Sequence, residues 1–407
     1  MHRATIAITA SAVLATTGSA GVTYRTIALT GQQAPGCDEG VTFASFTEQP
    51  KMNNSGRVAF RAYLAGPGVT SANSSAIWSD RTGALTMEIR SGSDAPGLDP
   101  GIALNVGIPV LTDSGRIGFG GWLSGDGITN NNRWTIVTDA TGEFAIIVRS
   151  GVPAPGTPEG TVLAPRGSAD DKFIVFNADA DCAFKWDIVG SGITTANDTC
   201  VWAHQGGSLR LVAREEQRPA GTPEGVFYRS FSFDPQINDS GRIAFEASLK
   251  GAVTSADDHG IWIDDWGVQS PFSKGGDPAP LGIPGATFTG PFSPRLNGAG
   301  DICFRSYLKG SGINVNNDAS LWVSESGVLR LLAREGDQIP GLSAGVRYTT
   351  GLWAELNDAG TIAMKIAPSA GNQSIWKDEG GTRTQLFTAG QPEPAWSPPA
   401  IYTYLLN

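Results

Sequence analysis

A motif that recurs six times is the feature that most constrains the fold of this chain. It has the form Asn-x-x-Gly-x-x-Ala-Phe, and its copies begin at residues 53, 112, 177, 238, 297 and 357. Successive copies therefore lie 59, 65, 61, 59 and 60 residues apart. A period of this length means that each repeat is a supersecondary unit that cannot bury its apolar faces alone, so neighbouring units must pack on one another.

Composition favours β-structure within each repeat. The 407 residues include 53 glycines and 25 prolines, charged residues make up only 17%, and no long helical pattern interrupts the repeats. Many short strands joined by glycine- and proline-rich turns are typical of all-β proteins. The net charge of −10 disfavours nucleic acid and anionic membrane surfaces as partners.

The motif itself predicts a turn followed by a strand. Asn and Gly are turn residues, and the residues after them alternate, as in Ile243, Phe245, Ala247 and Leu249, with the period of two that marks a strand. The residue before the Phe position is small in every copy, which suits a sheet that a neighbouring sheet approaches closely. These small residues are Ala59, Gly118, Ala183, Ala244, Cys303 and Ala363.

Three further strands are expected in each repeat. A Phe-rich stretch precedes the turn, and a fourth strand ends in an arginine, as at Arg90 and Arg334. The strand between the motif strand and the arginine strand carries one tryptophan per repeat, which we expect to be a core anchor rather than a stacking platform for sugars. These tryptophans are Trp78, Trp202, Trp262, Trp322 and Trp376, with Trp134 in that role in the second copy.

These strands predict a β-propeller of four-stranded blades of about 60 residues each, with the Phe-rich strand innermost and the arginine strand outermost. A β-solenoid is the alternative architecture. Six complete repeats are present. An extra outer strand is expected at residues 24–29 and an extra inner strand at Ile401–Asn407, and together these could form a partial seventh blade.

The first twenty residues predict a secretory signal peptide. A short basic start at His2 and Arg3 is followed by an apolar run too short to span a bilayer and by small residues at Gly18 to Ala20. We therefore expect residues 21–407 to form a single repeat domain, secreted, periplasmic or at the cell surface. No later segment is long and apolar enough to be a transmembrane helix.

The repeats resemble a family of exported bacterial proteins described as choice-of-anchor tandem repeat NxxGxxAF-containing proteins. The motif copies carry the resemblance, together with the Ile-Trp pairs and the segment from Ala333 to Gly341, and it covers nearly all of residues 22–407. It implies export, a propeller-like body and attachment to the cell surface by varied C-terminal signals, and it implies no catalytic activity. No anchor segment follows Asn407 in this sequence, so tethering is not carried over to this chain.

No residue is assigned a catalytic role. Ser343 lies in a Gly-x-Ser-x-Gly match, but the repeat places this match in an ordinary loop between strands. After export only His204 and His259 remain, and both are interpreted as solvent-facing loop residues, so a three-histidine metal site is excluded. A hydrolase or lyase acting on an extracellular polymer, with carboxylates at the propeller's mouth, remains the alternative function.

No cofactor is predicted, although weak calcium sites were considered. Asp179 and Asp181 stand in the third copy of the ordinary turn, where an EF-hand is ruled out because Cys182 replaces the required glycine. Asp94, Asp277 and Asp337 recur after the outer strand, and pairing with the nearby Arg90, Lys274 and Arg334 is favoured over calcium. Cys182 and Cys200 could form a disulfide or remain two buried thiols.

The favoured interpretation is a non-enzymatic, monomeric binding or structural module with an unidentified protein or glycan ligand. The candidate binding surface consists of Gly/Asn loops before the Trp strands, although these residues could serve only to fold the loops. The loops are residues 66–73, 125–132, 190–198 and 310–318.

Overall fold

A computed structural model describes residues 25–46, 48, 50–165 and 174–390. Strands are the regular secondary structure throughout this part of the chain, so the all-β prediction is confirmed. Among these residues no helix has the length and apolarity needed to cross a membrane. The predicted signal peptide and the predicted strand Ile401–Asn407 lie outside the described residues.

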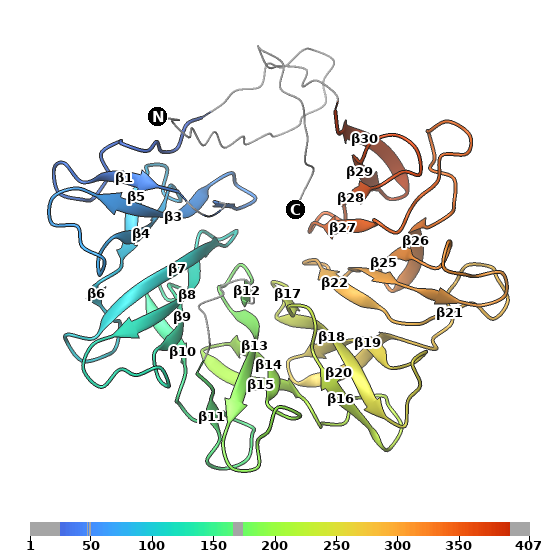
Figure 1. Ribbon diagram of the computed structural model, residues 1–407, viewed down its shortest axis with the longest axis horizontal. Coiled ribbons are helices and arrows are strands. Elements are labelled where there is room, and N and C mark those ends of the chain that lie inside the picture. Colours follow the sequence, from blue (N-terminus) through green and yellow to red (C-terminus); the bar gives the residue numbers. More distant parts are fainter. Residues whose placement is uncertain (1–24, 47, 49, 166–173, 391–407) are drawn as a thin grey trace. The chain divides into compact units, whose positions relative to one another are not determined.

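The contacts divide the chain into two compact units, with their boundary in the third repeat. The first unit holds the first two repeats and most of the third (Figure 1). The first repeat forms β1 (Thr42–Ser45), β2 (Lys51–Met52), β3 (Val58–Ala65), β4 (Ser75–Ser79) and β5 (Thr86–Arg90). The second forms β6 (Ser93–Asp94), β7 (Ala103–Leu111), β8 (Ile117–Ser124), β9 (Trp134–Thr138) and β10 (Ala145–Arg149). The third forms β11 (Val162–Leu163), β12 (Ile174–Phe176), β13 (Cys182–Val189), β14 (Thr199–Gln205) and β15 (Ser208–Arg214).

The second unit holds the last three repeats. The fourth repeat forms β16 (Val226–Ser230), β17 (Gln236–Ile237), β18 (Arg242–Gly251), β19 (His259–Asp265) and β20 (Val268–Lys274). The fifth forms β21 (Thr287–Phe288), β22 (Phe292–Leu296), β23 (Ile302–Ser306), β24 (Leu308–Lys309), β25 (Ser320–Glu325) and β26 (Val328–Arg334). The sixth forms β27 (Trp353–Leu356), β28 (Ile362–Ile366), β29 (Ser374–Glu379) and β30 (Thr382–Thr388).

Each repeat makes an antiparallel sheet in the predicted strand order. The order is β16-β18-β19-β20 in the fourth repeat and β27-β28-β29-β30 in the sixth, so the Phe-rich stretch pairs with the motif strand and the arginine strand lies at the far edge. The predicted four strands per sheet do not hold throughout the described residues. The first four sheets have five strands, the fifth repeat forms a four-stranded sheet and the separate pair β21-β24, and the sixth sheet has four. In the fourth repeat β16 and β17 both pair with β18, because residues 231–235 interrupt the strand and Pro235 has no N–H to donate.

The motif's turn forms as predicted. In the first copy the Gly56 N–H donates to the Asn53 carbonyl (2.9 Å), and the Arg57 N–H donates to the Asn53 side-chain oxygen (3.0 Å). Gly56 has φ +73°, a conformation that favours glycine. In the third copy Ala180 holds the same place at φ +62°, where its Cβ makes the backbone strained.

The motif's asparagine also joins consecutive repeats. The Asn53 side-chain amide donates to the Thr112 carbonyl at 3.0 Å, Asn238 donates to the Asn297 carbonyl at 3.0 Å, and Asn297 donates to the Asn357 carbonyl at 3.2 Å. Each bond runs from one turn to the turn of the following repeat. The sequence pattern predicted the turn but not this bond between repeats.

The small residue before the Phe position is packed against the next repeat. Ala59 lies in one apolar cluster with Leu104 and Phe119 of the second repeat. A Cβ on Gly118 would lie 2.4 Å from the ring of Phe176 in the third repeat, so only glycine fits there. In the second unit Ala244 lies in one apolar cluster with Phe288 and Phe304 of the fifth repeat. The predicted close approach of neighbouring sheets is therefore confirmed within each compact unit.

The tryptophan core is confirmed except in the second repeat. Trp78 has no exposed surface and pairs across the ladder with Phe60, and Trp202, Trp262 and Trp322 are buried in the same way. In the second repeat the partner of Phe119 is Val137, whereas Trp134 lies opposite Trp122 and is half-buried. The core role assigned to Trp134 is therefore wrong. An offset of three residues along a strand moves a side chain to the other face of the sheet.

A second set of contacts joins repeats through buried aspartates. Arg81 pairs with Asp139 of the next repeat, and Arg330 pairs with Asp378 (2.9 Å), which Arg383 also contacts at 3.0 Å. Burial by itself raises the pKa of Asp378, but hydrogen bonds from Arg330, Arg383 and the Gly381 amide outweigh it, so the pKa lies below its usual value.

The extra outer strand expected at residues 24–29 is not formed in the described residues. Residues 26–29 carry no strand, and only Arg25 makes an isolated bridge. The Arg25 side chain instead pairs with the buried Asp80 at 2.6 Å.

Candidate functional site

The loop around Ser343 is a structural turn, as its position in the repeat predicted. Ser343 is exposed, and its carbonyl accepts from the Val346 N–H (3.1 Å) and from the Gln338 side chain (3.0 Å). Gln33 makes the matching contact before the first repeat's sheet, where its side chain donates to the Asp38 carbonyl at 2.9 Å. The serine therefore belongs to a repeated loop.

The two histidines were wrongly placed in loops. His204 lies within β14 and is half-buried, and burial lowers its pKa while the charge of Asp181 opposes that shift. His259 is the first residue of β19, and its Nδ1 lies 2.6 Å from an Asp258 carboxylate oxygen. β14 extends further beyond Trp202, and β19 begins further before Trp262, than the tryptophan positions indicated.

The aspartates considered for calcium do not form one recurring site. Among the described residues no group of three or more His, Cys, Asp or Glu side chains is arranged to hold a metal ion. Asp277 pairs with Lys274 as predicted (3.3 Å). The pairings expected for Arg90 and Arg334 are wrong, because each donates its Nε to the carbonyl of a loop asparagine, Asn73 (2.8 Å) and Asn317 (2.7 Å).

Cys182 and Cys200 are free, buried thiols in this structure. The backbone of His204 hydrogen-bonds Cys182, and Cys200 lies four residues earlier than His204 on β14. Four residues of extended strand span about 13 Å, whereas disulfide-bonded Cα atoms lie about 4.4–6.8 Å apart. The disulfide alternative therefore does not fit the strand register.

The Gly/Asn loops are folded by their own asparagines. The Asn73 side chain accepts from the Thr70 N–H at 2.7 Å and donates to the Gly68 carbonyl at 3.2 Å, and Asn132 and Asn317 make the same two bonds in their loops. These amides are committed to the turn. The folding role is thus the one that the structure supports for these loops.

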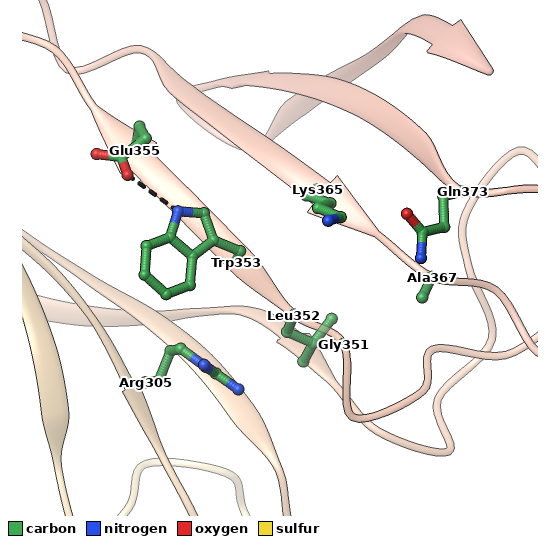
Figure 2. Close-up of a pocket in the computed structure, with 8 residues that line it drawn as sticks. All are labelled: Arg305, Gly351, Leu352, Trp353, Glu355, Lys365, Ala367 and Gln373. Atoms are coloured by element: carbon green, nitrogen blue, oxygen red, sulfur yellow. Dashed lines mark hydrogen bonds between the residues drawn. The ribbon is translucent and has the colours of Figure 1, made fainter. Parts of the chain in front are cut away.

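A pocket of about 490 Å³ lies within the second unit, where β23 of the fifth repeat faces β27 and β28 of the sixth. Figure 2 shows the Trp353 ring projecting from β27 toward Arg305, with Lys365 and Gln373 carried by neighbouring parts of the sheet. The residues that line the pocket are Arg305, Gly351, Leu352, Trp353, Glu355, Lys365, Ala367 and Gln373.

Strand pairing explains why these side chains converge. Trp353 is the cross-strand partner of Lys365, so both point to the same face of the sixth sheet. Glu355 lies two residues after Trp353 on β27 and shares that face. In the fifth sheet Arg305 pairs across the ladder with Phe292.

Two arginines flank the Trp353 ring. The Arg295 guanidinium carbon lies 5.0 Å from the ring centre and that of Arg305 lies 5.9 Å from it. Arg305 also lies 4.9 Å from the ring centre of Phe292. Such cation–π contacts fix the guanidinium over the rings and leave its in-plane N–H groups able to bind an acceptor. Burial lowers the pKa of Arg305, with the nearby Tyr307 opposing that shift.

Glu355 holds the indole and one arginine in place. Its Oε1 accepts from Trp353 Nε1 (2.9 Å) and its Oε2 accepts from Arg295 Nε (2.9 Å). Both carboxylate oxygens are therefore engaged, and the Glu355 charge is paired with Arg295. The arrangement suits recognition of a ligand that offers an apolar face to Trp353 and an acceptor oxygen to Arg305.

The sequence interpretation missed this pocket, although a signal was present. Arg305 and Lys365 both follow the motif's Phe/Met position, a slot that the repeat itself defines. Trp353 stands four residues before the motif's asparagine, where the other copies have Gln49, Ile108, Phe173, Asp234 and Ser293. Tryptophan occupies this slot in the sixth copy alone, and that substitution was the available signal.

One family model matches the chain, over residues 6–151 and 113–405, and its description is Family of unknown function (DUF7453). The chain belongs to this family. No match was found among curated proteins.

Several solved structures are similar to this chain. The β-propeller domain of the Trilobed protease from Pyrococcus furiosus has 12% identity over 86% of this chain and 85% of that chain, with a TM-score of 0.42. An oligogalacturonate lyase in complex with manganese has 13% identity over 89% and 85%, with a TM-score of 0.41. The SapL1 lectin in complex with alpha methyl fucoside has 11% identity over 84% and 96%, with a TM-score of 0.30. Likeness at this level gives no ligand or activity to this chain.

Proposed function

We propose that this protein is an exported binding module in which the repeats form the scaffold and the pocket around Trp353 binds the ligand. The observation that carries the proposal is an indole held by Glu355 and flanked by Arg295 and Arg305 beside a pocket of about 490 Å³. Pockets with an aromatic platform and a few placed polar groups are typical ligand sites.

The hydrogen bonds that Glu355 already makes favour binding over hydrolysis at this site. Glycoside hydrolysis commonly uses two carboxyl groups on either side of the bond that breaks. Glu355 is the one carboxylate among the residues that line this pocket, and both of its oxygens are occupied by Trp353 and Arg295. Its geometry suits a residue that positions the binding groups.

The finer architecture is part of the proposal. We take the sheets as blades of one six-bladed β-propeller rather than as rungs of a solenoid. The support is that Ala59 packs on the second repeat in the first unit and Ala244 packs on the fifth repeat in the second unit. Small-angle X-ray scattering tests this, because a closed ring is compact and a solenoid gives the profile of a rod.

Export is tested separately. We expect the protein recovered from outside the cytoplasm to begin at Gly21, after loss of residues 1–20. N-terminal sequencing of that protein checks the expectation, and an intact Met1 on exported protein would contradict it.

The binding proposal is tested with a glycan and small-molecule array probed with the purified mature protein. We expect retained ligands to be lost with Trp353→Ala and kept with Trp266→Ala. Trp266 is the matched control, since it is 54% exposed and its Nε1 donates to the Ser240 carbonyl outside the pocket. Equal binding by the two variants would place the ligand elsewhere and overturn the proposal.

A further inference from the structure

We propose that the pocket binds an acidic glycan, a saccharide chain bearing carboxylates, and that the site extends beyond Trp353 along a row of aromatic rings on the fourth and fifth repeats. This inference rests on the proposed function, since it names the ligand class of the same site. It is carried by the charge of the pocket, by the partners of Arg305 and by the arrangement of the rings.

The charge of the pocket is opposite to that of the chain. The chain has a net charge of −10, yet Arg305 lines the pocket without an ion pair to any described residue, and the one carboxylate of the lining, Glu355, is paired with Arg295. A cationic pocket on an acidic protein selects an anionic group at that place, because the surrounding charge repels anions from the rest of the surface.

Arg305 is positioned to donate hydrogen bonds to an acceptor oxygen of a bound ligand. Among the described residues it contacts the rings of Phe292 and Trp353 and makes no ion pair. A guanidinium stacked on rings presents a planar fork of N–H donors, whose geometry matches a carboxylate. The half-buried position strengthens such a pair by reducing its exposure to water.

The aromatic rings continue away from the pocket. Phe292 is stacked on Tyr307 with ring centres 5.8 Å apart and planes 24° apart, and on Phe233 at 6.4 Å and 27°. Phe233 and Tyr307 are 37% and 46% exposed, which is unusual for large apolar side chains. Because Arg305 contacts both Phe292 and Trp353, the row and the pocket form one surface.

This surface fits a sugar chain. The apolar C–H face of a sugar ring can pack on Trp353 and on the rings of the row, while a carboxylate of the saccharide chain reaches Arg305. Single-stranded nucleic acid also combines stacking with charge. Oligo-dT therefore serves as the competing ligand in the test below.

The test uses isothermal titration calorimetry with uronic-acid oligosaccharides of two and six units, the same oligosaccharides with their carboxylates reduced to alcohols, and oligo-dT. We expect the acidic hexamer to bind at least tenfold more tightly than the dimer and than the reduced hexamer. Arg305→Gln should weaken binding of the acidic hexamer at least tenfold and leave the affinity for the reduced hexamer unchanged.

The row is tested with Phe233→Ala, with Trp266→Ala as the matched control for loss of an exposed aromatic. We expect Phe233→Ala to lower the affinity for the acidic hexamer severalfold and to leave the affinity for the dimer unchanged. Equal loss for both lengths, or none for either, would overturn the extended site.

The outcomes separate this inference from the proposed function. Equal binding of acidic and reduced hexamers that is lost with Trp353→Ala would overturn the acidic ligand and leave the binding module standing. Tighter binding of oligo-dT than of the acidic hexamer would overturn the glycan. If binding of every retained ligand survives Trp353→Ala, the proposed function itself fails.

Discussion

Arg61 and Arg305 occupy the same slot in two repeats, directly after the motif's Phe, and have different partners. Arg61 donates to the Val106 carbonyl of the next repeat (3.2 Å) and pairs with Glu48, and its side chain is only 12% exposed. Arg305 contacts the rings of Phe292 and Trp353 and lines a pocket.

The difference shows that the repeat determines the position of the arginine, whereas the residues around it, which differ between repeats, determine its role. In the first unit Glu48 and a backbone carbonyl satisfy Arg61, so this arginine stabilises the contact between two repeats. In the second unit Trp353 fills the space in front of Arg305 without neutralising it. One scaffold position thus serves stability in one place and is suited to recognition in another.

The largest effect on the stabilising side of this comparison is expected at Asp378. Asp378→Asn leaves Arg330 and Arg383 without their shared buried carboxylate, so we expect a loss of about 3 kcal/mol in the free energy of unfolding. Because the folded pKa of Asp378 is lowered, its contribution is full above the unfolded value of about 3.9 and is lost as the pH falls below it. Urea unfolding at pH 7 and below pH 4 checks this, and a difference between wild type and variant that does not shrink at low pH would contradict it.

Replacing Arg61 and Arg305 by glutamine, one at a time, tests the comparison directly. Arg61→Gln should cost about 2 kcal/mol of stability, because Glu48 keeps a charge in a half-buried place, and should leave ligand binding unchanged. Arg305→Gln should cost less than about 1 kcal/mol, since the structure gives it no ion pair to lose. Thermal unfolding and calorimetry on both variants measure the two effects, and equal stability losses would remove the distinction.

The bonds that the motif's asparagines make between repeats are expected to contribute about as much as Arg61 does. Asn297→Ala removes the bond within its turn and the bond to the Asn357 carbonyl, so we expect about 2 kcal/mol. Asn357→Ala is the matched control, because its side chain accepts the Thr361 N–H within its own turn, and about 1 kcal/mol is expected. Losses of the same size in chemical unfolding would show that the contact between repeats contributes nothing.

The smallest effect is a gain at Ala180. This residue holds φ +62° where other copies have glycine, so Ala180→Gly should raise the free energy of unfolding by about 1 kcal/mol. Ala183→Gly in the neighbouring strand is the control and should lower it. A loss of stability with Ala180→Gly would mean that packing of the Ala180 methyl group outweighs the backbone strain.

The sequence predicted what the repeat determines. The strand order, the turn at Gly56 and the packing of Ala59 on the next repeat follow from local chemistry and period. The pocket did not follow, because the meeting of Arg305 with Trp353 depends on how the fifth and sixth sheets pack. Trp134 was misplaced because one tryptophan per repeat was assumed to keep one register, and in the second repeat Val137 occupies the core position.

The most direct test of the account is a crystal structure of the mature protein with a bound acidic hexasaccharide. The account predicts a sugar ring packed on Trp353, a carboxylate within hydrogen-bond distance of Arg305 and further sugar units along Phe292 and Tyr307. A hexasaccharide bound at the Gly/Asn loops, or at the Arg61 position of the first unit, would contradict it.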